Sequence, residues 1–203
     1  MTMTMTNKIA SNTKSVACAL AAAANTLKSA QRIRILSALF LALVALGLAG
    51  KASAQPNCNA AGQHWSATVP QVNQRHIFCG EIGSGGQPKG YHSTQNPPPT
   101  NVVVSVVNVV PIANGIYNAT VNFNNHTHKI STFFPNACTA NQIVQSVVYA
   151  ANNQTGPAPG WGVYGMSAPP GGGAAYCLNS AAAPFRIKMG LLGNGDVNTA
   201  FPN

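Results

Sequence analysis

Two histidines near the middle of the chain are the clearest candidates for chemistry. His76 and His92 flank a stretch dense in glycine, in a chain of 203 residues that carries only two acidic residues. Histidine is the side chain whose ordinary pKa lets it both accept and donate a proton near neutral pH. Two histidines brought together therefore suit paired general acid and general base catalysis. The glycines between them allow the backbone to turn back on itself.

The other histidines and the single glutamate carry weaker signals. His64 precedes a tryptophan and is typical of a surface or packing histidine. His126 and His128 are two residues apart, so in an extended segment they share one face, but the spacing supplies no third metal ligand. Glu81 can orient a histidine or the loop backbone, although a single acid in a glycine-rich loop is usually solvated. We therefore predict neither a metal site nor a cofactor.

An apolar run near the start predicts a secretory leader. Residues 35–50 read ILSALFLALVALGLAG, basic residues precede them, and Ala-Ser-Ala follows at 52–54. A basic region, an apolar region and a small-residue cleavage site are the parts of a signal peptide. The run is shorter than the roughly 20 residues that span a membrane. We expect a leader over residues 1–54, cleavage after Ala54, and a secreted or periplasmic mature protein without a membrane span; an uncleaved anchor is the alternative.

The net charge changes once the leader is set aside. Of the eleven lysines and arginines, six lie within residues 1–54, whereas both acids, Glu81 and Asp196, lie beyond it. Five basic and two acidic residues give the mature chain a net charge of +3 rather than +9. An excess of this size permits binding to nucleic acid but does not require it.

Four cysteines remain in the mature chain, namely Cys58, Cys79, Cys138 and Cys177. An even number of cysteines in an exported protein indicates disulfides, here two. Four cysteines allow three pairings, and the sequence does not choose among them. Removing 54 of the 203 residues leaves 149, from 55 to 203. This length fits a single domain with its own core. We expect the mature protein to be a monomer.

The residues after the glycine-rich stretch predict an α+β fold with many strands and turns. Residues 101–110 read NVVVSVVNVV, which is typical of a strand covered on both faces. Asn114-Gly115 predicts a hairpin turn, and residues 116–124 then alternate between apolar and polar side chains. We therefore expect the valine run and the alternating segment to form a hairpin.

The remaining residues predict one helix and two further strands. Thr-Ala-Asn-Gln at 139–142 is a capping-box signature, and the apolar spacing that follows predicts a helix from Ala140 to about Ala151. Residues 155–173 are crowded with glycine and proline and are expected to form a long irregular loop. Short strands are expected over 184–190 and 197–201, on either side of a turn at Asn194-Gly195.

Five short blocks follow one another in order between residues 75 and 203. They are His76-Ile77-Phe78, Gly80-Glu81, Gly90-Tyr91-His92, Lys129 to Pro135, and Thr199-Ala200-Phe201-Pro202. In this order they resemble the bacterial EndoU nuclease domain. The resemblance implies small antiparallel sheets with a few helices, distantly similar to ribonuclease A, over a domain of residues 55–203. It also implies a metal-independent endoribonuclease with a His-His-Lys active site.

The chemistry that the resemblance implies is cleavage of RNA by its own 2′-hydroxyl. His92 is expected to act as the base that takes the 2′-hydroxyl proton, and His76 as the acid that protonates the departing 5′-oxygen, which leaves a 2′,3′-cyclic phosphate. Lys129 is expected to stabilise the charged transition state. Lys89, within the glycine-rich stretch, is the alternative cation, because on sequence alone either lysine can reach a phosphate.

Hydroxyl groups and one aromatic ring are the expected nucleotide contacts. Thr199 and Phe201 are two residues apart on a strand and point the same way, so a base can be hydrogen-bonded and stacked. Related domains often have tyrosine where this chain has Phe201. Phenylalanine can still stack on a base, but it lacks the hydroxyl group of tyrosine. Ser131 and Thr132 complete the expected substrate-binding set with Lys89. The alternative for Phe201 is a core position.

The resemblance further implies an antibacterial toxin or effector acting on tRNA or RNA in general. A cell that produces such a toxin requires a cognate immunity protein as a partner. A general extracellular scavenging ribonuclease is the enzymatic alternative. A catalytically inactive module that binds RNA or a surface is the alternative from a different class, and the presence of both histidines argues against it.

Overall fold

The computed structural model of the chain describes residues 56–60, 62 and 64–203. The expected leader and its cleavage site after Ala54 lie outside these residues. Within the described part, no helix is long and apolar enough to cross a membrane.

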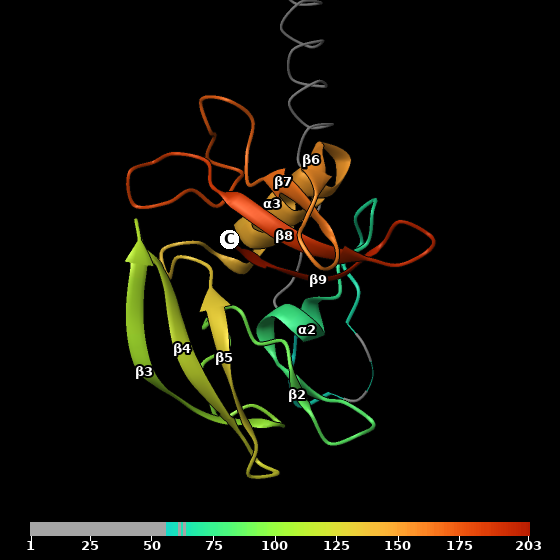
Figure 1. The fold of residues 1–203 in the computed structure, drawn as a ribbon, viewed down its shortest axis with the longest axis vertical. Coiled ribbons are helices and arrows are strands. Elements are labelled where there is room, and N and C mark those ends of the chain that lie inside the picture. Colours follow the sequence, from blue (N-terminus) through green and yellow to red (C-terminus); the bar gives the residue numbers. More distant parts are fainter. Residues whose placement is uncertain (1–55, 61, 63) are drawn as a thin grey trace, which may run out of the picture. The chain divides into compact units, whose positions relative to one another are not determined.

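Small antiparallel sheets and two helices make up the described residues, which confirms the expected α+β class at this level (Figure 1). The first sheet pairs β1 with β2, the second has the order β3-β4-β5, and the third has the order β6-β7-β8-β9. The elements are α2 (Gln74–Phe78), β1 (Glu81–Ile82), β2 (Pro88–Lys89), β3 (Val103–Ala113), β4 (Ile116–Phe123), β5 (His128–Phe133), α3 (Ala140–Asn152), β6 (Gln154–Pro157), β7 (Val163–Met166), β8 (Arg186–Leu191) and β9 (Val197–Pro202).

The hairpin of β3 and β4 forms as predicted. Asn114 and Gly115 form its turn with positive φ angles of 49° and 86°, which Asn-Gly favours. Every second side chain of β4 is buried, from Tyr117 to Phe123, so the predicted alternation is confirmed. These side chains form a core with Tyr91, Val103 and Phe133.

The prediction that the valine run is covered on both faces is wrong. β3 is an edge strand, and Val104, Val109 and Val110 are each more than half exposed. The pairing with β4 shifts register between Val107 and Val110, where Asn108 has a positive φ of 52°. A run of valines favours a strand but does not reveal its neighbours. An edge position with an irregular register leaves apolar side chains in solvent.

The C-terminal sheet packs against α3, whose capping box of Thr139 and Gln142 is present as predicted. Strands β8 and β9 occupy the two expected segments. Residues 155–173 are not irregular throughout, because β7 and most of β6 lie within them. The close packing of β7 on α3 requires glycine at Gly165, because a Cβ atom there would overlap the Ala150 carbonyl oxygen of α3. A side chain would therefore separate helix from sheet.

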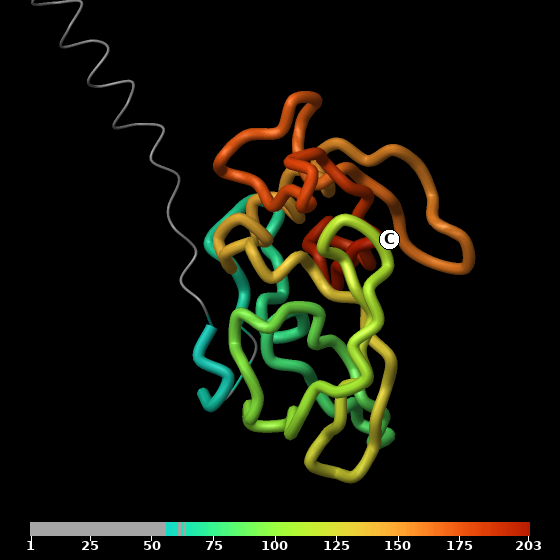
Figure 2. The backbone as a smooth tube through the Cα atoms, turned by 90° about the vertical axis from the view of Figure 1, so that its left-hand side faces the viewer, coloured from blue at the N-terminus to red at the C-terminus, as the bar shows by residue number. Residues whose placement is uncertain are grey.

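The last strand, β9, lies between β8 and α2 (Figure 1). Figure 2 shows the final strand, in dark red, near the middle of the described part of the chain, with Asn203 itself exposed. Strand β9 pairs with β8 of the C-terminal sheet. It also contacts β5, which belongs to the second sheet. Side chains from α2, β5 and β9 therefore meet in one region.

Two disulfides select one of the three possible pairings. Cys58 bonds to Cys79 and Cys138 bonds to Cys177. Cys79 caps the C-terminal end of α2, so the first disulfide ties the helix that carries His76 to the start of the described chain. Disulfides persist in oxidising compartments, so the two bonds indicate an extracytoplasmic environment.

Candidate active site

His76 lies on a short helix rather than in a flexible loop. Asn73 caps α2 by accepting a hydrogen bond from the His76 backbone N–H at 3.2 Å. The His76 side chain is mostly buried, and its Nδ1 lies 3.2 Å from Glu81 Oε2. A carboxylate can only accept in this bond, so Nδ1 carries the hydrogen and Nε2 is free to exchange a proton.

Glu81 is not the solvated loop acid that the sequence favoured. It is half-buried at the start of β1 and is the carboxylate partner of His76. The hydrogen bond from His76 is the main reason that the pKa of Glu81 is lowered, against the opposing effect of burial. The ionised carboxylate accepts the bond from Nδ1–H and so orients the ring.

His92 is held against α2 by backbone hydrogen bonds. The His92 N–H donates to the Ile77 carbonyl and the Tyr91 N–H donates to the His76 carbonyl, each at 2.7 Å. The His92 Nδ1 lies 2.9 Å from the Thr132 carbonyl oxygen of β5. Since a carbonyl can only accept, Nδ1–H is the donor and Nε2 keeps its lone pair. His92 is thus oriented to accept a proton.

The surroundings of His92 keep its ring neutral. Burial of the ring lowers the pKa of His92 well below the ordinary value, and the charges of Lys129 and His76 lower it further. The bond to the Thr132 carbonyl opposes this shift without cancelling it. The rings of His76 and His92 lie 6.1 Å apart between centroids, at 28° between their planes. The structure therefore brings together the two histidines that the sequence singled out and gives them unlike partners.

Lys129 lies beside this pair on β5. Its Nζ donates to the Gly90 carbonyl at 3.0 Å, and the buried Ser131 donates to the same oxygen at 3.2 Å. Burial lowers the pKa of Lys129 to about 8. Lys89 lines the same cavity from β2 but is exposed. Lys129 is the lysine whose ammonium is fixed next to the histidines.

The remaining expected residues line the cavity in different ways. Phe201 on β9 stacks on the His92 ring at 5.0 Å between centroids and 24° between planes, and it is partly exposed rather than in the core. Thr199 lines the same cavity two residues earlier. The Thr132 hydroxyl donates to Asn118 at 3.0 Å, so its side chain supports β4 while its carbonyl holds His92.

One cavity of about 380 Å³ joins these groups. The residues that line it come from α2, β2, β5, β9 and two loops: His76, Pro88, Lys89, Gly90, His92, Lys129, Ile130, Ser131, Thr132, Trp161, Thr199 and Phe201. The sequence interpretation did not include Ile130 or Trp161. Both are large apolar side chains with high exposure, which a sequence does not reveal, although a tryptophan in a glycine-rich segment was a visible signal.

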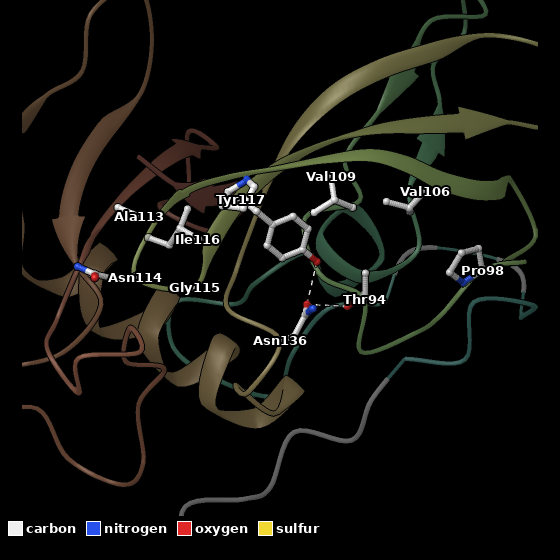
Figure 3. A pocket seen from close by; sticks show the side chains of 11 residues that line it. Thr94, Pro98, Val106, Val109, Ala113, Asn114, Gly115, Ile116, Tyr117 and Asn136 are labelled. Atoms are coloured by element: carbon white, nitrogen blue, oxygen red, sulfur yellow. Dashed lines mark hydrogen bonds between the residues drawn. The ribbon is translucent and has the colours of Figure 1, made fainter.

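A second cavity, of about 490 Å³, is larger but lacks groups for proton transfer near neutral pH (Figure 3). Its walls are mainly apolar, including Val106, Val109 and Ile116. The Tyr117 hydroxyl donates to Asn136 Oδ1 at 2.8 Å, and Thr94 donates to the same atom at 2.9 Å, so its polar groups bond to one another. The chemistry therefore points to the smaller cavity with the histidines.

The other histidines lie outside the cavity. His126 has a positive φ of 63° in the turn before β5, so the extended conformation considered for His126 and His128 is not found there. Both side chains are exposed. Across the described residues, no three His, Cys, Asp or Glu side chains form a group that could hold a metal ion.

Gly90 is the residue that lets the two histidines approach. It has a φ of 66°, and a Cβ atom there would overlap the His76 carbonyl oxygen. We expect Gly90→Ala to lower cleavage of RNA at least tenfold, because β2 must move from α2 and carry His92 with it. The matched control is Gly86→Ala, at a φ of 79° but with open space around the added atom. Kinetic assays and thermal melting of both variants test this, and equal activities would contradict it.

The pH dependence of catalysis should reflect the neutral His92. Because its pKa is lowered, the ring stays unprotonated as the pH falls through about 6.5, the ordinary histidine value. We expect kcat/KM to decline only below that pH. Lys129→Gln removes the positive charge that lowers the pKa of His92 most, so that pKa rises and the acidic limb moves to higher pH in the residual activity. A profile from pH 4 to 8 with the same acidic limb in both proteins would contradict the assignment.

The fold and the paired histidines define an α+β protein with a candidate acid–base site. Residues 70–203 match the family described as bacterial EndoU nuclease, and the chain belongs to this family. Membership implies an endoribonuclease whose substrate is RNA. Neither the curated proteins nor the solved structures gave a match.

Proposed function

We propose that the protein cleaves RNA by transphosphorylation, with His92 as the general base and His76 as the general acid. The observation that supports this best is the unlike bonding of two neighbouring rings. His92 Nδ1 donates to a carbonyl and the ring is kept neutral, whereas His76 Nδ1 donates to the ionised Glu81. One ring is thus prepared to take a proton and the other to carry one.

The proposed reaction needs no group beyond those of the chain and the RNA. His92 Nε2 takes the proton of the ribose 2′-hydroxyl while the 2′-oxygen forms a bond to phosphorus. The bond from phosphorus to the 5′-oxygen breaks, and His76 Nε2–H supplies the proton to that oxygen. The products are a 2′,3′-cyclic phosphate and a 5′-hydroxyl.

Lys129 is the proposed electrostatic partner of the reacting phosphate. One of its three N–H donors is used by the Gly90 carbonyl, which leaves two for non-bridging oxygens. Hydrogen-bond donors fixed before the reaction stabilise developing negative charge without reorganising. Thr199 and Phe201 are the proposed contacts of the base next to the scissile bond, with Ser131, Thr132 and Lys89 at the cavity wall.

A product test distinguishes this reaction from hydrolysis. The disulfide-bonded protein is incubated with an RNA oligonucleotide in EDTA, and the ends of the fragments are identified by mass spectrometry. We expect 2′,3′-cyclic phosphate ends, and no cleavage of an oligonucleotide with a single 2′-deoxyribose at the scissile position. Cleavage of the deoxy control, or loss of activity in EDTA, would refute the proposal.

We further propose that the enzyme is exported, with residues 1–54 removed, and acts as an antibacterial effector opposed by a cognate immunity protein. The two disulfides support export, and the effector role rests on the family. Induced synthesis of the mature enzyme in a bacterial cytosol that permits disulfide formation should arrest growth, whereas the same chain with His92→Ala should not. Growth unaffected by an active enzyme would favour a scavenging role.

A further inference from the structure

Trp161 is an exposed aromatic side chain at the end of the catalytic cavity. It lies between β6 and β7, lines the cavity and is 49% exposed. Indole is the largest aromatic group in a protein, and it is usually more deeply buried when its role is packing. An indole left half in solvent beside a nucleic-acid site offers a flat surface for a base.

The indole is held in place by close contacts below it. A Cβ atom at Gly190 would lie 3.2 Å from the indole Cζ3, so the ring rests closely on the backbone of β8. The neighbouring Gly162 has a φ of 78°, and a Cβ there would overlap the Met189 carbonyl oxygen. These glycines bring the Trp161 segment against β8. The indole therefore packs closely against β8 on one side.

A line of rings connects Trp161 to the histidines. The centroids of Trp161 and Phe201 are 6.0 Å apart, those of Phe201 and His92 are 5.0 Å apart, and those of His92 and His76 are 6.1 Å apart. The Trp161 plane is tilted by 59° from that of Phe201, so the two rings offer separate surfaces to successive bases rather than one continuous stack. A nucleotide bound beyond Phe201 would thus meet the indole next.

Lys188 places a positive charge at the same end. Its Nζ lies 4.4 Å from the centroid of the Trp161 ring and donates to the Pro159 carbonyl at 3.0 Å. The structure gives it no ion pair with a carboxylate in the described part of the chain. The ammonium lies over one face of the indole, so a base would stack on the other face. Aromatic rings and basic side chains are the groups that proteins use together along single-stranded nucleic acid.

We propose that Trp161 and Lys188 form an outer subsite that stacks the base of a nucleotide flanking the cleaved step and contacts its phosphate. The substrate is then single-stranded RNA that extends at least one nucleotide beyond the cleaved dinucleotide, with the flanking base unpaired. This rests on the proposed ribonuclease function.

The kinetic test compares a dinucleotide with trinucleotides extended on either side. Trp161→Ala should lower the ratio of kcat/KM on one trinucleotide to kcat/KM on the dinucleotide by about five- to a hundredfold, the usual effect of losing one stacked base. Trp161→Phe, which keeps an aromatic ring, should lower this ratio less than Trp161→Ala does. The matched control is Tyr164→Ala, which removes a ring that also has a cation, Arg186, 4.4 Å from its centroid but does not line the cavity. An unchanged ratio, or the same reduction in Tyr164→Ala, would overturn the subsite.

A binding test separates this inference from the catalytic one. The chain has two tryptophans, so Trp65→Phe leaves Trp161 as the sole indole. A single-stranded oligonucleotide with 2′-deoxyribose throughout should quench its fluorescence, and a duplex of the same sequence should not. If wild-type protein cleaves neither di- nor trinucleotides, the ribonuclease proposal fails, and quenching alone decides the stacking site. If cleavage occurs without quenching or a changed ratio, the subsite fails while the catalytic proposal stands.

Discussion

Replacing either histidine with alanine is expected to lower RNA cleavage by about 10²- to 10⁴-fold, the usual contribution of one proton transfer. His76 and His92 share one cavity, so each variant loses one of the two transfers. His126→Ala and His128→Ala are the matched controls, because both rings are exposed and outside the cavity. Near wild-type rates in both His76→Ala and His92→Ala would reject the mechanism.

A substrate with a better leaving group tells the two roles apart. A nucleoside 3′-phosphate ester of p-nitrophenol needs no proton on its departing oxygen. We expect His76→Ala to recover most of its activity on this ester, while His92→Ala, which still lacks the base, stays slow. Recovery in His92→Ala but not in His76→Ala would make His92 the acid and His76 the base.

Removal of the Lys129 charge should lower RNA cleavage nearly as much as replacement of a histidine. We expect Lys129→Met to lower kcat by about 10²- to 10³-fold, as found when one donor to a developing charge is lost. Its ammonium is fixed by the Gly90 carbonyl beside both histidines, so the effect should fall on the chemical step rather than on KM.

Lys89→Met is the matched control for this lysine. Lys89 is exposed at the rim on β2, so its loss should change KM by less than about tenfold. Thermal melting of both variants checks that each protein is folded. A larger loss of kcat in Lys89→Met would move the electrostatic role to that residue.

Local patterns predicted the parts of the fold that depend on near neighbours in the chain. The alternation of β4, its Asn-Gly turn and the capped helix α3 are each encoded within a few residues. The exposure of β3 depends on which strands lie beside it, and a run of valines is the same in an edge strand and a central one. Strands β6 and β7 are short, and close contacts with α3 and β8 require glycine at Gly165 in β7 and at Gly162 just before it.

The candidate site was predictable in most of its residues but not in its bonds. The glycines between His76 and His92 pointed to their approach. The helix α2 was missed because five residues give too little periodicity, and its cap is the single residue Asn73. Glu81 and Lys129 acquire their partners only through tertiary contacts with His76 and Gly90. Trp161 joins the cavity from a segment with no neighbouring motif.

The bonds that position His92 and Lys129 share one property: their acceptors are backbone carbonyls, whereas His76 is held by the side chains of Asn73 and Glu81. His92 bonds to the carbonyls of Ile77 and Thr132, and Lys129 bonds to that of Gly90. A carbonyl persists whatever side chain its residue carries. Saturation mutagenesis should therefore find the exposed positions around the site tolerant to exchange, with Gly90, Glu81 and Asn73 as sensitive points. Related chains could then diverge widely in sequence while keeping the same frame for catalysis.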